Sequence, residues 1–159
     1  KLNTLNPALL DQAIAALRDL AMRPGLRAAV LTGEGERAFI GGADIGAMAA
    51  LETPAEAEAF IRRVHGICAA IRDLPVPVIA RIPGWCLGGG LEVALACDIR
   101  ICDDSAMFGM PEVKVGIPSV IHAALLPRLL GQARADWLLL CCENIDAVRA
   151  EAWSLYADA

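Results

Sequence analysis

The 159-residue sequence predicts an α/β fold in which strands alternate with helices. Amphipathic helices begin at Asn6-Pro7 and at Thr53-Pro54, because an N-cap residue followed by proline favours a helix start. Short apolar runs at 27–32 and 77–82 are typical of buried strands, and glycine-rich turns follow them. No internal repeat or linker divides the chain, so we expect one domain over residues 1–159.

The elements of the first half follow from periodicity and from turn residues. Apolar side chains recur at helical spacing after Asn6-Pro7, and Pro24-Gly25 ends that pattern. The segment between the first strand and Asp44 is rich in glycine and polar residues, which favours a loop. We therefore expect, in order, a helix over 7–20, a strand over 27–32, a loop over 33–44 and a helix from 54 to about 74.

The second half continues the same alternation. Pro83-Gly84 ends the strand at 77–82, and three glycines at 88–90 precede a short apolar helix. Asp146 is a suitable N-cap for the last helix. The sequence predicts a helix over 91–96, a strand over 99–102, a short segment at 107–109 after a turn, a loop over 111–118, and helices over 120–130, 133–142 and 147–155.

Composition restricts the possible partners. Hydrophobic residues make up 57% of the chain, charged residues 21%, and the mean hydropathy is +0.51, so we expect self-association. No uninterrupted apolar run reaches the roughly 18 to 20 residues that a membrane span requires. The net charge of −5 and the absence of a basic run argue against a nucleic-acid partner.

The six cysteines form no C-x-x-C pair, which fits free thiols in a reducing compartment such as the cytoplasm. The amino-terminal residues show no signal-peptide pattern.

Two glycine-rich segments are candidate binding sites. In the first, Gly41-Gly42-Ala43-Asp44 precedes a predicted helical turn, where an unpaired N–H can face an anion. A tight surface loop is the alternative. In the second, residues 84–92 connect a buried strand to a helix, a common position for a binding crevice. Three consecutive glycines allow backbone N–H groups to converge on developing negative charge, or simply allow close packing. The spacing fits neither a P-loop nor a dinucleotide-binding fingerprint.

Two glutamates stand in apolar surroundings. Glu92 lies in the first turn of the predicted helix 91–96, and Glu112 lies in a loop of apolar residues and glycine. Burial raises the pKa of a carboxyl group towards the range useful for proton transfer. Exposed positions are the alternative, with Lys114 as a partner for Glu112. The two histidines, His65 and His122, have no partner at ligand spacing, so we expect structural roles for them and no metal site.

Taken together, the segments 38–45, 75–101 and 108–119 resemble the enoyl-CoA hydratase/isomerase (crotonase) family. The resemblance implies a spiral of ββα units with two roughly perpendicular sheets flanked by helices, and assembly as a homotrimer or homohexamer. It implies an enoyl-CoA hydratase that acts on a 2-enoyl-CoA thioester, with no cofactor apart from the coenzyme A of the substrate. This chain would then be the core of such a protein, without the family's first strands and its C-terminal trimerisation helices.

The resemblance also implies roles for individual residues. The N–H groups of Ala43 and Gly89 would form an oxyanion hole, Glu92 would activate water, and Glu112 would deliver a proton. Cys86 has no suitably placed histidine or aspartate, and we reject it as a nucleophile. Implied substrate-binding residues are Gly41, Gly42, Asp44, Ile45, Trp85, Gly88, Pro111 and Gly116.

Besides lacking the family's first strands and C-terminal helices, the chain would depart from the family pattern in two places. Gly46 stands where many members carry lysine, and 119–124 (SVIHAA) replaces a G-A-G-G segment that contributes to the acyl pocket. Substrate preference is therefore open. The alternatives are a sibling reaction on the same fold, such as double-bond isomerisation, decarboxylation or thioester hydrolysis, and a non-catalytic assembly module.

Overall fold

The structure, a computed structural model, describes residues 2–156. Within them seven strands form two sheets. The first sheet is entirely parallel, and the second is parallel except for its last strand. In hydrogen-bonded order, the first contains β1 (Ala29–Thr32), β3 (Val78–Ile82) and β5 (Ile99–Cys102), and the second contains β2 (Ala38–Ile40), β4 (Trp85–Leu87), β6 (Met107–Gly109) and β7 (Ile145–Asp146).

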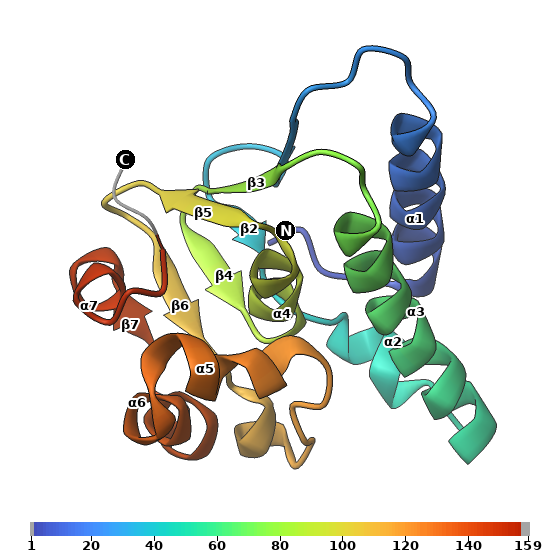
Figure 1. Ribbon diagram of the computed structural model, residues 1–159. Helices are drawn as coiled ribbons and strands as arrows, with labels where there is room; N and C mark the ends of the chain where they lie inside the picture. Colours follow the sequence, from blue (N-terminus) through green and yellow to red (C-terminus); the bar gives the residue numbers. More distant parts are fainter. Residues whose placement is uncertain (1, 157–159) are drawn as a thin grey trace.

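The strands follow a spiral path. Consecutive strands alternate between the sheets, since β1, β3 and β5 belong to one and β2, β4 and β6 to the other. Helices follow β2 and β4, so the chain winds through ββα units, and the strands of the two sheets run in clearly different directions (Figure 1). The predicted α/β class and the spiral of ββα units are confirmed.

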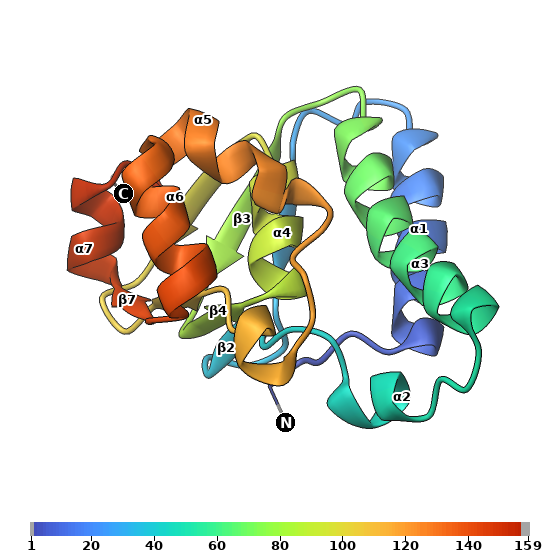
Figure 2. The same ribbon diagram turned by 90° about the horizontal axis from the view of Figure 1, so that it is seen from below.

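The helices flank the two sheets. They are α1 (Pro7–Ala21), α2 (Ile45–Ala49), α3 (Pro54–Arg72), α4 (Gly89–Ala96), α5 (Leu126–Leu130), α6 (Gln132–Asp136) and α7 (Ala147–Ala152). Helices α1 and α3 lie side by side on one side of the sheets, and α5, α6 and α7 gather on the other (Figure 2). The predicted caps form: Asn6 accepts the N–H of Leu9, Thr53 makes a capping box with Glu56, and Asp146 accepts the N–H of Arg149.

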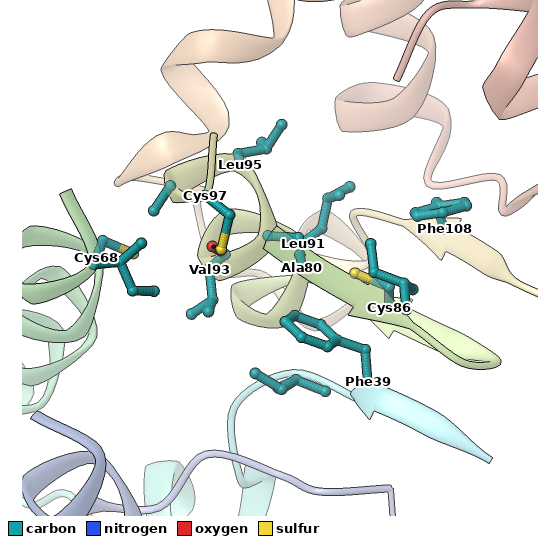
Figure 3. Close-up of a cluster of buried hydrophobic side chains, with 14 of the residues drawn as sticks. Phe39, Cys68, Ala80, Cys86, Leu91, Val93, Leu95, Cys97 and Phe108 are labelled. Atoms are coloured by element: carbon teal, nitrogen blue, oxygen red, sulfur yellow. Dashed lines mark hydrogen bonds between the residues drawn. The ribbon is translucent and has the colours of Figure 1, made fainter. Parts of the chain in front are cut away.

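Helix α4 passes through the centre of the core. Its Leu91, Val93 and Leu95 are at most 3% exposed, and the surrounding side chains come from both sheets and from α3. Figure 3 shows these neighbours: Phe39 of β2, Ala80 of β3, Cys86 of β4, Phe108 of β6 and Cys68 of α3. The helix begins at Gly89, two residues before the predicted start. Because α4 is enclosed, any polar side chain on it is removed from water.

The strands β2 and β4 occur where the sequence predicted none. The segment 33–44 contains β2, and the turn after Gly84 contains β4. Each has only three residues, and each is stabilised by pairing with a strand far away in the sequence. The predicted loop over 33–44 is therefore wrong at its centre. The short strand β7 was also not predicted.

The predicted long helices near the carboxyl end are also wrong. The region over 120–130 is a 3₁₀ helix (His122–Leu125) followed by α5, and the region over 133–142 is α6 followed by a π-helix (Trp137–Cys141). Gly131 separates them with φ of 80° and ψ of 156°, a conformation open essentially only to glycine. Helix α7 ends at Ala152 rather than at 155, and the loop 111–118 contains a 3₁₀ turn, Glu112–Val115. Among the described residues, no helix has the length and apolar character needed to cross a bilayer.

Candidate active site

A cavity of about 750 Å³ opens beside the amino-terminal end of α4. Residues of α2, of α3 and of the segment 111–121 line it. The cavity is within the size range of sites for small ligands and cofactors. Its lining is mainly apolar, and Ala43, Gly89, Glu92 and Glu112 all contribute to it. The two glycine-rich segments and the two glutamates of the sequence analysis therefore meet at one place.

The backbone at Ala43 directs an unused N–H away from the neighbouring strand. Leu5 donates its N–H to the carbonyl of Gly42 at 2.9 Å and accepts the N–H of Asp44 at 2.9 Å. In a parallel bridge of this kind, the residue between the two bonded partners points its own N–H to the opposite side. No backbone carbonyl within residues 2–156 accepts the N–H of Ala43.

A second unused N–H belongs to Gly89, the first residue of α4. The first N–H groups of a helix have no intrahelical acceptor, and no other backbone carbonyl of the described chain takes this one. A Cβ placed on Gly89 would lie 3.9 Å from the backbone nitrogen of Ala43. Two backbone donors from distant segments are therefore close together at the edge of the cavity.

Gly88 allows the Glu112 carboxylate to lie close to the turn that precedes α4. Its φ of 53° and ψ of −125° suit glycine alone, and its N–H donates to the carbonyl of Gly109 at 2.8 Å. A Cβ at Gly88 would collide with the carboxylate of Glu112 and lie 3.2 Å from its Cδ. The missing side chain therefore lets the Glu112 carboxylate rest against the turn that precedes α4.

Glu92 of α4 is held by backbone N–H groups of the segment 121–123. It is 4% exposed, and its Oε1 accepts the N–H groups of Ile121 at 2.9 Å and Ala123 at 3.1 Å. Burial raises the pKa of this carboxyl group, and the N–H groups of Ala123, Ile121 and His122 oppose the rise. Glu92 is thus a fixed carboxylate whose ionised form is still partly supported by hydrogen bonds.

Glu112 has a different environment. Its Oε2 is enclosed and has no hydrogen-bond partner in the described structure. Burial raises the pKa of Glu112 and the negative charge of Glu92 raises it further, while its own N–H and the side chain of Ser119 oppose the rise. The two carboxyl groups are therefore electrostatically coupled, and Glu112 is the better placed of the two to hold a proton.

Comparison with known proteins assigns the chain to a family. The family model described as enoyl-CoA hydratase/isomerase matches residues 1–158. The chain belongs to the enoyl-CoA hydratase/isomerase family.

Individual relatives agree with this assignment. The fatty acid oxidation complex subunit alpha of Vibrio vulnificus (strain CMCP6) is 39% identical over 154 residues, which are 95% of this chain and 22% of that protein. An enoyl-CoA hydratase from Bacillus anthracis superposes with a TM-score of 0.92 at 35% identity, covering 98% of this chain and 60% of the other. An enoyl-CoA hydratase/carnithine racemase from Magnetospirillum magneticum gives 0.92 at 33%, covering 98% and 59%. The chain thus spans less than two thirds of each relative.

The remaining residues implied by the family resemblance divide into two groups. Gly41, Gly42, Ile45, Gly88 and Pro111 line the cavity.

Asp44, Trp85 and Gly116 do not line the cavity. Asp44 caps α2 by accepting the N–H of Ala47, Trp85 is a half-buried residue of β4, and Gly116 ends the 3₁₀ turn in a left-handed conformation. Their positions indicate that they shape the segments around the cavity.

The sequence did not reveal the turn over 121–123 that holds Glu92. Apolar periodicity over 120–130 predicted a plain helix, whereas Ile121 has φ of −110° and ψ of −97°. Leu5, which the sequence analysis did not select, also lines the cavity and positions Ala43 through the parallel bridge. The sequence signal for this turn is weak: the segment 119–124 (SVIHAA) replaces the glycine-containing segment of many family members.

The rejection of Cys86 as a nucleophile agrees with its surroundings. Its side chain is fully buried between the strands, and burial raises the pKa of the thiol far above neutral pH.

Proposed function

We propose that the protein is an enoyl-CoA hydratase, which adds water across the α,β double bond of a 2-enoyl-CoA thioester. One observation carries the proposal: the buried carboxyl group of Glu92, the half-buried Glu112 and two unused backbone N–H groups line the same apolar cavity. Hydration needs both kinds of group, because charge develops on the thioester oxygen while one proton leaves the attacking water and another is delivered to Cα. The proposed reaction uses neither a metal ion nor a redox cofactor, since the thioester itself is the activated group.

The oxyanion hole consists of the N–H groups of Ala43 and Gly89. A thioester oxygen between them accepts two hydrogen bonds that strengthen as the oxygen becomes negative. The donors are fixed in advance, one by the bridge to Leu5 and the other by the start of α4. A donor of this kind contributes roughly 2.7–4 kcal/mol to transition-state stabilisation.

Glu92 is the base that activates water. The N–H groups of Ile121 and Ala123 bind its Oε1, which favours the ionised form and leaves the second oxygen for a water molecule. The carboxylate takes one proton from water while the water oxygen bonds to Cβ. The electron pair of the double bond moves towards the thioester oxygen, where the two N–H groups receive the charge.

Glu112 is the acid that completes the addition. Its enclosed Oε2 and the nearby charge of Glu92 favour the protonated form. As the enolate returns its electron pair, Glu112 gives its proton to Cα, so water adds as a hydroxyl group at Cβ and a hydrogen at Cα. Glu92 then carries the proton taken from water, and proton exchange restores the starting state.

The family relationship supports this reaction and also defines its competitor. The Bacillus anthracis relative is called an enoyl-CoA hydratase, and the family name also includes isomerases. Isomerisation moves a proton between two carbons and needs one carboxylate. The second carboxyl group at the cavity, Glu112, favours hydration over isomerisation.

Hydration of crotonyl-CoA, followed by loss of the ultraviolet absorbance of its conjugated double bond, tests the proposal. Glu92→Gln and Glu112→Gln should each lower kcat/KM by about 10²–10⁴-fold, because amide replacement keeps the size and removes the acid–base group. Glu58→Gln is the control, since Glu58 forms only an exposed ion pair with Arg62. Loss in one variant alone would favour isomerase, and no turnover by the wild type would favour an assembly module.

Self-association as a homotrimer or homohexamer is also proposed. Several large apolar side chains are exposed outside the cavity, among them Leu140 at 69% and Val148 at 74%. Apolar surface of this kind is stabilised when a symmetric partner covers it.

A further inference from the structure

The turn that holds Glu92 contains a histidine whose side chain has no assigned role. Backbone N–H groups of three consecutive residues, Ile121, His122 and Ala123, support the Glu92 carboxylate. The 3₁₀ helix that follows begins at His122 itself. The His122 side chain is therefore attached to the backbone that fixes the proposed base.

The imidazole of His122 is poorly suited to carry charge. Its Nδ1 is enclosed and lacks a hydrogen-bond partner among the described residues. Enclosing the unbonded nitrogen of a neutral imidazole costs the free energy of one ordinary hydrogen bond to water. Enclosing the unbonded N–H of an imidazolium costs far more free energy, because the hydrogen bond that it loses is charge-assisted. The first turn of a helix also disfavours a cation.

The charged groups that face His122 add to this. Burial lowers its pKa, and Arg72 and His65, both on α3, lower it further by repulsion. On α4, Glu92 contacts the turn by accepting hydrogen bonds from its backbone. His122 is accordingly neutral at neutral pH and becomes charged only in acid.

We propose that His122 is a positioning residue for Glu92: the neutral imidazole keeps the 121–123 turn closed on the carboxylate, and protonation opens the turn. A protonated Nδ1 has no acceptor in its enclosed position, so the side chain moves towards water and draws the N–H groups off Oε1. Without those bonds the ionised form of Glu92 loses support, and the carboxyl group takes up a proton at a higher pH. One protonation thereby promotes a second, and the acid limb of activity involves two coupled protons.

The experiment compares two histidine variants, since the chain contains only two histidines. His122→Asn puts an amide oxygen near the position of Nδ1 and cannot be protonated. His65→Asn is the control, because it removes the other imidazole of the chain, which lies on α3 and outside the 121–123 turn. The kcat/KM for crotonyl-CoA is measured against pH, and each profile is normalised to its own plateau. The wild type and His65→Asn should lose activity in acid with a two-proton slope, and His122→Asn with a one-proton slope at lower pH.

A second measurement does not depend on turnover. The carboxyl carbon of Glu92 is followed by nuclear magnetic resonance as pH falls. Opening of the turn predicts a lower titration midpoint for Glu92 in His122→Asn than in the wild type. Simple attraction between an imidazolium and the carboxylate predicts the opposite order, and a purely structural histidine predicts equal midpoints. Either of those two results overturns the inference.

The inference rests on the proposed function only for its activity readout. Absence of hydration at every pH would refute the hydratase proposal, and the Glu92 midpoints would still decide the role of His122. Normal hydration with superimposable acid limbs in all three proteins would refute the positioning role and leave the hydratase proposal intact.

Discussion

The substitution Gly88→Ala tests how the backbone positions Glu112. Gly88 has positive φ, and a Cβ there would occupy the space of the Glu112 carboxylate. The substitution keeps every side chain of the cavity and every backbone N–H. We expect it to impair hydration severely by displacing one carboxylate.

The magnitude has two parts. A backbone conformation suited to glycine alone costs about 1–3 kcal/mol when alanine adopts it, which lowers the free energy of unfolding. The Glu112 carboxylate must also move by about 1 Å to restore ordinary contact, and a displacement of that size costs about 10²-fold in rate. Urea unfolding measures the first part, and kcat/KM for crotonyl-CoA measures the second.

Gly131→Ala is the matched control. Gly131 also has a conformation suited to glycine, and a Cβ there meets nothing within 4 Å. It should lose similar stability and retain its rate. If folded Gly88→Ala hydrates crotonyl-CoA as fast as Gly131→Ala does, the contact between the turn and Glu112 has no catalytic importance.

Four further predictions concern the two backbone donors, Glu112 and self-association. Gly89→Pro should abolish hydration, because proline has no N–H to donate, although it fits the first position of a helix. Gly89→Ala should keep the N–H donor and the activity, because the added Cβ would meet only ordinary contacts at 3.7–4.0 Å. Ala43→Pro should likewise abolish hydration and Ala43→Ser retain some; a folded proline variant at either site with normal turnover would exclude that N–H as a donor. Glu112→Gln should stabilise the fold at neutral pH. Because the pKa of Glu112 is raised in the folded state, the wild type loses free energy of unfolding as pH rises above the ordinary pKa of 4.5. The melting temperature of Glu112→Gln should therefore exceed that of the wild type by a margin that grows from acid to neutral pH, and a margin that shrinks would contradict the raised pKa. Sedimentation at micromolar concentration should show a trimer or hexamer, and a clean monomer would refute self-association.

Local signals explain which parts of the fold the sequence could predict. Helices α1 and α3 start where predicted because Asn6-Pro7 and Thr53-Pro54 supply caps within a few residues of the chain. Strands β2 and β4 could not be predicted, because three-residue strands have little propensity of their own and are stabilised by pairing with distant strands. Their pairing with each other brings the two glycine-rich segments together, so their omission concealed the reason that Ala43 and Gly89 meet.

The site shows the same division. Glu92 and Glu112 could be selected from sequence because a carboxylate among apolar residues is unusual. The support of Glu92 by the turn over 121–123 could not, because hydrogen bonds between backbone N–H groups and a distant carboxylate leave no periodic pattern. The predicted helix over 120–130 fails at its start because Ile121 has φ of −110° and ψ of −97°, outside the helical region.

The most direct test of the central proposal is the fate of the water oxygen. Crotonyl-CoA is incubated with the protein in water enriched in the heavy oxygen isotope, and the products are analysed by mass spectrometry. Hydration by Glu92 and Glu112 predicts intact 3-hydroxybutyryl-CoA with one heavy oxygen, on the carbon that was Cβ. Release of free coenzyme A with the heavy oxygen in a carboxylate, or unchanged crotonyl-CoA, would contradict it.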